Sequence, residues 1–296
     1  MQKTADNLAE KAVLITGSSS GIGRACVLLL VKRGFQVFAG VRKVADGDAL
    51  QAAAGVGVTP VVMDVTDAAS IAAAAREVTS QLDKRGLSGL VNVAGIGLTG
   101  PLEYVALDDL RKIFEVNVFG QFAVIQAFMP LIRKGCGRIV NMGSVGAHIA
   151  IPFGGPLAAS KSAFGSLNDS LRLELQPFGI RVCVIEPASI HTPAVDKTLG
   201  DVEGLIGRLP SEAARRYGQM LRTFTSRARA RELNGSPPEL VAGTVLRALT
   251  ARRPHTRYPV GKDSLPLTIL PWLLPDRLLD GLRARLFGLP ATVQSQ

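Results

Sequence analysis

The segment that decides the fold is Thr16-Gly17-Ser18-Ser19-Ser20-Gly21-Ile22-Gly23. It follows the apolar run 12–16 and opens a helical pattern over residues 21–33. Glycines allow a tight turn and a close backbone approach to a pyrophosphate, while the N–H groups and dipole of a helix N-terminus attract that anion. A glycine cluster alone is weak evidence, because turns use glycine everywhere, but one between a strand and a helix predicts a dinucleotide-binding loop.

Short apolar runs alternate with helix-length segments through most of the chain. The runs have the length and boundaries of buried strands and cover residues 12–16, 36–40, 58–63, 90–93, 138–142 and 181–186. The helical segments between them include 21–33, 68–84, 107–131 and 158–178. This alternation predicts an α/β fold, a doubly wound parallel sheet with helices on both faces, and residues 258–260 are a candidate seventh strand.

The chain is predicted to form a single domain over residues 1–296. No Pro-, Gly- or Ser-rich linker and no internal repeat divides residues 1–190. Residues 194–235 break the alternation with an Arg-rich segment, helical around 211–220, which we expect to be a lid insertion over the carboxyl edge of the sheet. Residues 262–296 form an apolar and amphipathic tail.

The net charge of +10 is concentrated in the last third of the chain. Residues 197–296 hold 16 Lys+Arg and 8 Asp+Glu, against 18 and 16 in residues 1–196. A polyanionic partner, an acidic ligand and a membrane surface are the functional interpretations, and a solvated Arg-rich helix is the simplest one. The basic run 215–231 has few aromatic residues and no known reader motif, so nucleic-acid binding is not predicted.

Cysteine usage and the N-terminus indicate the compartment. Cys26, Cys136 and Cys183 are odd in number and lack C-x-x-C spacing, which predicts neither a disulfide framework nor a zinc site. We expect no metal site. Residues 1–11 are polar and carry no secretory signal, and no run of about 20 uninterrupted apolar residues is present. The prediction is a cytoplasmic protein, soluble or peripheral to a membrane.

The glycine loop and later motifs resemble one enzyme family. The spacing T-G-x-x-x-G-I-G is similar to that of short-chain dehydrogenases/reductases, and the resemblance extends over residues 8–261. Its further landmarks are Asp64 in Met-Asp-Val-Thr, Asn92-Val93-Ala94-Gly95, Asn117, Ser144, Lys161, and Glu186-Pro187 with Ile190 and Thr192. Residues 85–92 look most like the branch that acts on steroids, retinoids and other hydrophobic alcohols or ketones. The resemblance implies a sheet of order 3-2-1-4-5-6-7 and a nicotinamide-dependent oxidoreductase.

The charge after the second strand favours NADP(H) over NAD(H). NAD-binding members place an acid there, which would repel a 2′-phosphate, whereas this chain has Arg42 and Lys43. Arginine can hold a phosphate through paired, charge-assisted hydrogen bonds. With these two, the expected cofactor-binding residues are Gly17, Ser19, Ser20, Gly21, Ile22, Gly23, Arg42, Lys43, Asp64, Val65, Asn92, Ala94, Gly95, Lys161, Pro187, Ile190 and Thr192.

The resemblance also implies a catalytic set, and one member is missing. Ser144 would polarise the carbonyl, Lys161 would hold the cofactor ribose, and Asn117 would support the lysine through water. In the family a tyrosine four residues before the lysine, on the same helix face, transfers the proton. That position is Leu157, and no tyrosine lies between Tyr104 and Tyr217. Leucine has no proton to transfer, so the sequence predicts impaired turnover.

Three interpretations of Leu157 remain open. In the first, the chain is an enzyme disabled by an engineered change. In the second, it is a natural pseudoenzyme that binds NADP(H) as a sensor or subunit. In the third, it is an enzyme in which another group transfers the proton. This third interpretation ranks lowest, and in it Ser144, a water on Lys161 or His148 supplies the proton. Val93 and Ala188, where the family has asparagine and glycine, favour natural drift slightly.

The expected partner is a small hydrophobic alcohol or ketone. Its pocket walls would be apolar residues after the serine and in the lid. These are Ile149, Ala150, Ile151, Phe153, Val195, Leu199, Leu205 and Ile206. The resemblance further implies a homo-oligomer, a dimer or tetramer. The basic amphipathic helix expected over residues 275–288 would pack on its own domain or a partner subunit, with peripheral membrane contact as the alternative.

Overall fold

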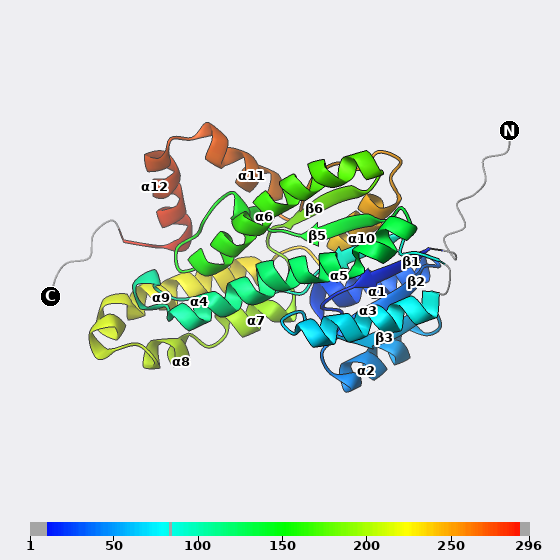
Figure 1. Cartoon of the computed structure of the whole chain (residues 1–296). Helices are drawn as coiled ribbons and strands as arrows, with labels where there is room; N and C mark the ends of the chain where they lie inside the picture. The colour runs from blue at the N-terminus through cyan, green and yellow to red at the C-terminus, as the bar shows by residue number, and fades with distance from the viewer. Residues whose placement is uncertain (1–10, 83–84, 291–296) are drawn as a thin grey trace.

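A computed structural model describes residues 11–82 and 85–290, and its centre is a seven-stranded parallel sheet (Figure 1). The strand order is β3-β2-β1-β4-β5-β6-β7, which confirms the prediction. The strands are β1 (Ala12–Ile15), β2 (Gln36–Val41), β3 (Val58–Val62), β4 (Gly89–Asn92), β5 (Arg138–Met142), β6 (Arg181–Pro187) and β7 (Arg257–Val260). Because β1 lies between β2 and β4, the chain reverses direction across the sheet there, and ligands of such sheets bind at this point.

Helices cover both faces of the sheet, so side chains of each strand enter two separate cores. In β1, Val13 and Ile15 belong to one core and Leu14 to the other, because successive side chains of a strand point to opposite faces. The first core lies under α1 (Gly21–Lys32), α2 (Val44–Ala54) and α10 (Pro238–Thr250). The second lies under α3 (Ala68–Leu82), α5 (Gln121–Lys134) and α6 (Gly155–Leu175). This two-sided burial explains why the strands are continuous apolar runs.

The helical segment Leu107–Lys134 bears on the expectation that no segment is long and apolar enough to span a membrane. From Leu107 to Lys134 the chain is helical without a break, through α4 (Leu107–Phe114), the π-helical η3 (Glu115–Gly120) and α5. It is long and apolar enough to cross a membrane by length and composition, although the sequence expectation was that no segment would be. Half of its most apolar window is buried inside the molecule, as in the core helix of a soluble protein.

The Arg-rich insertion folds into three helices beyond the carboxyl edge of the sheet. These are α7 (Pro193–Leu199), α8 (Val202–Gly207) and α9 (Ser211–Leu233), so the predicted helix around 211–220 is much longer than expected. Many of the arginines are paired: Arg222 with Glu203 of α8 at 2.7 Å, and Arg229 with Asp196 of α7 at 2.8 Å. Exposed ion pairs of this kind contribute little stability each, but these two link α9 to α8 and to α7.

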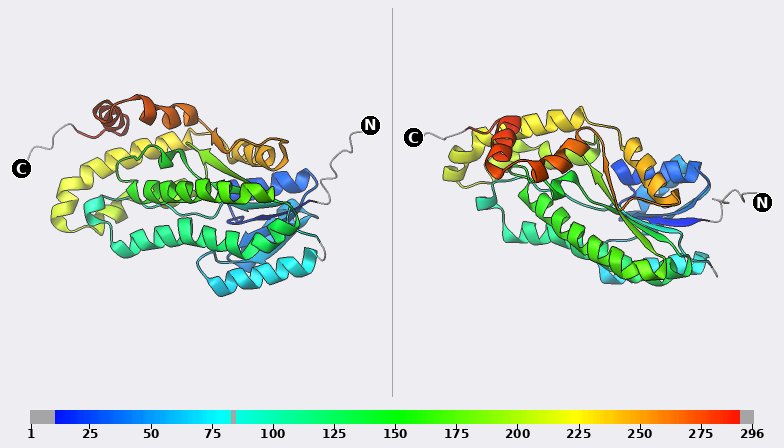
Figure 2. Two further views of the ribbon diagram at one scale, coloured as in Figure 1. Left: turned by 45° about the horizontal axis from the view of Figure 1, so that its top comes forward. Right: turned by 90° about the horizontal axis from the view of Figure 1, so that it is seen from above.

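The tail forms two further helices that lie across α9. They are α11 (Ser264–Leu273) and α12 (Asp276–Phe287), and the second matches the helix predicted over 275–288. The tail stands at the outer edge of the molecule in Figure 1 and in the left view of Figure 2. α12 contacts α9 through Phe287 and Phe224, whose ring centroids are 5.3 Å apart. α11 contacts β7 at the edge of the sheet and the turn at Val145–Ala147, so the tail rests on both the insertion and the sheet edge.

Candidate active site

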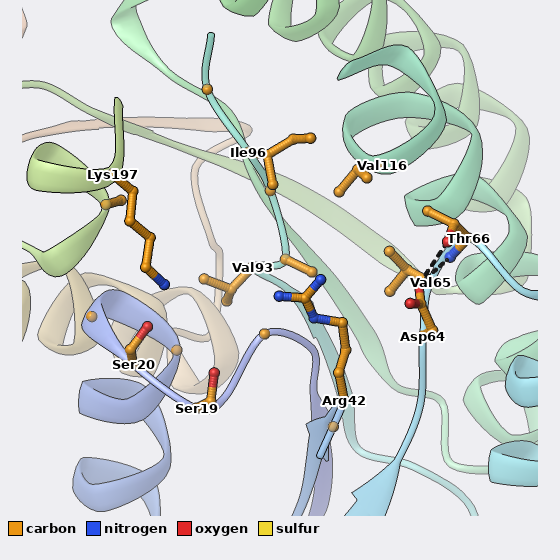
Figure 3. Close-up of a pocket in the computed structure, with 18 of the residues that line it drawn as sticks. Ser19, Ser20, Arg42, Asp64, Val65, Thr66, Val93, Ile96, Val116 and Lys197 are labelled. Atoms are coloured by element: carbon orange, nitrogen blue, oxygen red, sulfur yellow. Dashed lines mark hydrogen bonds between the residues drawn. The ribbon is translucent and has the colours of Figure 1, made fainter. Parts of the chain in front are cut away.

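A cleft of about 750 Å³ lies at the carboxyl ends of β1 to β4, where the strand order reverses. Figure 3 shows that Ser19 and Ser20 come from the glycine loop, Val93 and Ile96 from the loop after β4, and Lys197 from α7. The cleft is thus built from elements on both sides of the reversal point. This is where a dinucleotide binds in folds of this type.

Two glycines of the loop lie where a Cβ atom would not fit. Gly17 has φ of +66°, and a Cβ atom there would lie 2.8 Å from the backbone N of Ala94. A Cβ on Gly23 would lie 2.1 Å from the carbonyl oxygen of Gly17. The Thr16 hydroxyl also accepts hydrogen bonds from the backbone N–H groups of Val93 and Ala94, at 3.0 and 3.1 Å. The two loops are therefore locked together at a spacing that fits a pyrophosphate against bare backbone.

Arg42 lines the cleft at the end of β2, and Asp64 lines it after β3. The Asp64 carboxylate accepts hydrogen bonds from the backbone N–H and the hydroxyl of Thr66, at 2.9 and 2.7 Å. These two bonds, with a smaller contribution from the Arg42 charge, lower the pKa of Asp64. Asp64 is therefore held as a carboxylate acceptor, and Arg42 is the cation at this end of the cleft.

Most of the expected cofactor-binding residues line this cleft. They are Gly17, Ser19, Ser20, Gly21, Ile22, Gly23, Arg42, Asp64, Val65, Ala94, Gly95 and Thr192. Pro187 and Ile190 line the neighbouring apolar cavity instead. Lys43 is exposed at the start of α2 and does not line the cleft, and Asn92 is buried with its amide donating to Asn141 at 2.8 Å. These two placements differ from the expectation.

Lys197 is a cleft residue that the sequence analysis missed. It lies on α7, and its side chain points into the cleft toward Ser20, while Arg42 enters from the opposite side (Figure 3). The sequence carries no signal for this placement, because residue 197 is far from the glycine loop along the chain and no family motif or local pattern links the two. Its position places a second cation against the phosphate-binding backbone.

The three polar residues of the expected catalytic set lie close to one another. The Asn117 amide bonds both backbone groups of Ile96 at 2.9 Å and donates to the Ser160 hydroxyl at 3.0 Å. Lys161 is buried and donates to the carbonyl of Met142 at 2.6 Å, and its burial lowers its pKa from 10.5 to about 8. The Ser144 hydroxyl accepts from the N–H of Gly146 at 3.0 Å, which leaves its own O–H free to donate.

An apolar cavity of about 320 Å³ adjoins the cleft, and both Ser144 and Leu157 line it. Leu157 lies on α6 one turn before Lys161, on the same face of that helix. None of the three tyrosines lines either the cleft or this cavity. The cavity that Ser144 lines therefore holds no phenol.

The walls of this cavity correct part of the predicted pocket. Ile149, Ile151, Val195 and Leu199 line it as expected, but Ala150, Phe153, Leu205 and Ile206 do not. Phe153 packs edge-on against Phe224 at 5.3 Å. The remaining wall comes from α9 and the tail, namely Phe224, Ala228, Leu267, Leu270, Leu282, Leu286 and Phe287. Sequence analysis missed these because their approach depends on how α11 and α12 fold back.

His148, considered as a replacement proton donor, instead contacts a buried carboxylate. Its Nε2 lies 2.8 Å from the buried Glu186 carboxylate, which Arg257 also contacts at 2.5 Å. His148 lines neither cavity. Ala188, which replaces the family's glycine, does not have positive φ, and the next residue, Ser189, takes the left-handed conformation with φ of 46°. Among the described residues, no group of three His, Cys, Asp or Glu side chains is placed to hold a metal.

Comparisons with known proteins identify the family of the chain. The sequence model of the family described as short chain dehydrogenase matches residues 11–202. The chain is 34% identical to mouse retinol dehydrogenase 5 over 94% of this chain and 89% of that protein. It is 35% identical to human short-chain dehydrogenase/reductase family 9C member 7 over 96% and 92%.

Solved structures show the same fold. A short-chain dehydrogenase from Streptomyces avermitilis superposes with a TM-score of 0.69 at 27% identity, covering 94% of this chain and 96% of that one. One from Burkholderia cenocepacia, in complex with NADP, gives 0.68 at 26%, covering 93% and 97%. By its family model, its relatives and its fold, the chain belongs to the short-chain dehydrogenase/reductase family of oxidoreductases, in the retinol dehydrogenase-like branch.

Proposed function

We propose that this protein binds NADP(H) and a small hydrophobic alcohol or ketone at the described site, and that Leu157 makes hydride transfer slow. The observation that carries the proposal is the pairing of an intact glycine-loop cleft with an apolar cavity that both Ser144 and Leu157 line and that no tyrosine lines. Loss of a general acid–base costs about 10²–10⁴ in rate. The binding parts of the enzyme are kept while the proton-transfer part is lost.

Each remaining residue has a definite task in this proposal. The Ser144 O–H donates to the carbonyl oxygen of the ligand, since its oxygen already accepts from Gly146. The Lys161 ammonium, which also donates to the Met142 carbonyl, binds the cofactor ribose. Asn117 fixes the loop at Ile96 through hydrogen bonds to both of its backbone groups. When bound, the nicotinamide supplies or accepts the hydride. The proton that must accompany it has no side-chain donor at position 157.

The preference for NADP(H) rests on the charge around the adenosine end of the cleft. Arg42 lines that end, and the residues after β2 include no acid that would bind a free ribose hydroxyl and repel a phosphate. Arginine also suits a phosphate because it donates two parallel, charge-assisted bonds. NAD(H) remains the weaker cofactor in this proposal.

The experiment compares the unchanged chain with Leu157→Tyr and Leu157→Phe. NADPH binding is followed by its fluorescence, and NADPH oxidation is measured with all-trans-retinal and a steroid ketone as probe substrates. We expect all three proteins to bind NADPH alike and only Leu157→Tyr to turn over, since phenylalanine restores the ring but not the hydroxyl. Equal and measurable turnover by the unchanged chain and the tyrosine variant would refute the role given to position 157.

A second candidate function is that of a cofactor-loaded binding protein, a sensor or subunit. The intact cleft beside a lost proton donor favours it as much as a disabled enzyme. The same experiment separates the two. A tyrosine variant that binds NADPH but remains inactive on every probe substrate supports the binding protein, because further parts of the catalytic site would then have drifted.

A further inference from the structure

The apolar cavity beside the cofactor cleft has one charged group in its wall that the rest of the wall does not explain. Arg283 of α12 lines this cavity, and its side chain is only 23% exposed. Its Nε atom is buried and has no hydrogen-bond partner within residues 11–82 and 85–290. Nearly all buried donors in folded proteins are paired, because an unpaired one destabilises the fold. A ligand that brings an acceptor into the cavity would complete this pairing.

Other arginines of the molecule show what the Nε side of a guanidinium binds. Arg222 holds the Glu203 carboxylate through two hydrogen bonds, from Nε at 2.7 Å and from Nη2 at 2.9 Å. Arg229 uses the same two donors on Asp196, at 3.0 and 2.8 Å. These two donors form a planar fork that matches the geometry of a carboxylate. In Arg283 the Nε of this fork is the donor without a partner.

The ion pair that Arg283 does form leaves this side of the guanidinium open. Its Nη1 atom donates to Asp280 on the preceding turn of α12, at 3.1 Å. The Asp280 side chain is 66% exposed, so water screens the pair and its contribution is small. The pair therefore offsets only part of the Arg283 charge, and it supplies no acceptor to Nε.

The other two charged residues that line the cavity, Arg231 and Glu232 of α9, are already paired. Arg231 donates from Nη2 to Asp263 at 2.8 Å. The Glu232 carboxylate accepts from the backbone N–H of Ile190 at 3.1 Å. Of the charged side chains that the structure describes in this wall, only Arg283 therefore has a buried donor without an acceptor.

The positions of these charges give the cavity a direction. Glu232 contacts Ile190 of the loop expected to hold the nicotinamide, so an acidic group lies at the cofactor side. Arg283 lies on α12, whose Phe287 packs against Phe224 of α9 with ring centroids 5.3 Å apart. Phe224 and Glu232 are about two turns apart, or roughly 12 Å along α9. An anionic group would be repelled at the cofactor side and attracted to the tail side.

We propose that this cavity takes a hydrophobic oxo acid or hydroxy acid, whose carboxylate binds the Nε side of Arg283 while its carbonyl or hydroxyl lies at Ser144. This substrate class deepens the proposed function and rests on it, because the reacting end of the ligand is the one described there. Leu282 and Leu286 are among the apolar residues that would contact the hydrocarbon between the two ends. A cavity of about 320 Å³ is at the small end of ligand pockets, which suits a chain of medium length.

The test compares three ligands that share a methyl ketone and a hydrocarbon chain but differ at the opposite end. They are 9-oxodecanoic acid, its methyl ester and 2-decanone. Each is titrated by calorimetry, at neutral pH, into the full chain loaded with NADP⁺, which cannot reduce a ketone, so turnover does not affect the result. We expect the acid to bind about 10–100-fold more tightly than the other two, through charge-assisted hydrogen bonds. Equal affinities for the acid and the ester would overturn the proposal.

Arg283→Met tests whether this residue causes the preference. Methionine keeps an apolar chain but has no donor, so affinity for the acid should fall about 10–100-fold while affinity for 2-decanone is kept. Arg283→Lys keeps the charge without the fork and should bind the acid with intermediate affinity. Arg285→Met is the matched control, because Arg285 is exposed on the same helix and does not line the cavity. Equal loss of acid binding in Arg283→Met and Arg285→Met would contradict the assignment.

A failure of the acid site and a failure of the proposed function give different results. NADPH binding is measured by its fluorescence for every protein, which checks that each variant keeps its cofactor cleft. If 2-decanone and retinol bind but the acid binds no more tightly than 2-decanone, the acid site alone is refuted. If none of these ligands binds to the cofactor-loaded chain, the cavity is not the ligand site and the proposed function is refuted as well.

Discussion

The cofactor cleft and the apolar cavity are neighbours built in opposite ways. The cleft is formed by backbone at the ends of β1 to β4, where glycines at fixed positions bring two loops into contact. The cavity is formed by side chains from α6, α9, α11 and α12, which are distant in the sequence. The first tolerates almost no change of residue, and the second tolerates exchange of one apolar residue for another of similar size. This difference explains how position 157 could become leucine while the cleft kept its form.

The largest effect on the cleft should come from Gly23→Ala. Its Cβ would lie 2.1 Å from the Gly17 carbonyl oxygen, which is backbone and has nowhere to move. NADPH affinity should fall on the order of 100-fold or more, since a shift costing about 3 kcal/mol corresponds to that factor. Retinol binding in the cavity, followed by retinol fluorescence, should change little.

Gly243→Ala is the matched control for that change. Nothing lies within 4 Å of a Cβ at Gly243 in α10, so NADPH affinity should be unaffected. The free energy of unfolding should rise by about 0.5–1 kcal/mol from helix propensity. If NADPH affinity falls equally in both variants, the close contact at Gly23 is not the reason for the loss.

Lys161 lies where the two regions meet, and its burial should make stability depend on pH. Its pKa is about 8 in the folded protein against an ordinary 10.5, so between these values the unfolded chain binds more protons. The free energy of unfolding, relative to Lys161→Met, should therefore rise as pH increases from 8 to 10.5, by at most about 3 kcal/mol. Urea unfolding of both proteins across this range measures it. A difference that falls with pH would contradict a pKa of Lys161 that burial has lowered.

Arg42→Gln should separate the two cofactors. Loss of a charge-assisted phosphate contact should weaken NADPH binding by about 10–100-fold and leave NADH binding nearly unchanged. Lys43→Gln is the control, because Lys43 does not line the cleft. If Lys43→Gln has the larger effect on NADPH, the wrong cation has been assigned to the 2′-phosphate.

The smallest effect should come from Lys197→Met. A single mobile cation facing the phosphate-binding loop contributes about 1 kcal/mol, so NADPH and NADH affinities should both fall by roughly fivefold. Lys32→Met, on the exposed face of α1, should have no effect. An unchanged affinity in Lys197→Met would show that α7 does not take part in the cleft.

Sequence patterns predicted the parallel sheet and the glycine loop because these depend on local features, and the family resemblance supplied the strand order. Strand boundaries were correct to within a residue or two, since each buried strand is an apolar run limited by turn residues. The helices α2, α7, α8, α10 and α11 were not predicted individually. α11 holds Pro266 and Pro271, which hide a helix from pattern analysis, and α2 has only a weak amphipathic pattern.

The site was predictable where a motif fixes it and not where packing does. Ser144, Lys161, Asn117 and the position of Leu157 were implied by the family resemblance. Lys197 and the cavity walls from α9 and the tail depend on how the insertion folds over the sheet. Lys43 was placed in the cleft from its charge alone, but it is the residue before α2 and does not line the cleft.

The most direct test of the account is the single-turnover rate of NADPH oxidation by the unchanged chain and by Leu157→Tyr, each saturated with all-trans-retinal. Single turnover excludes product release, so the ratio of rates reports the chemical step alone. The account predicts that the tyrosine variant is faster by about 10²–10⁴. Equal rates in the two proteins, at equal NADPH occupancy, would contradict the claim that position 157 limits the reaction.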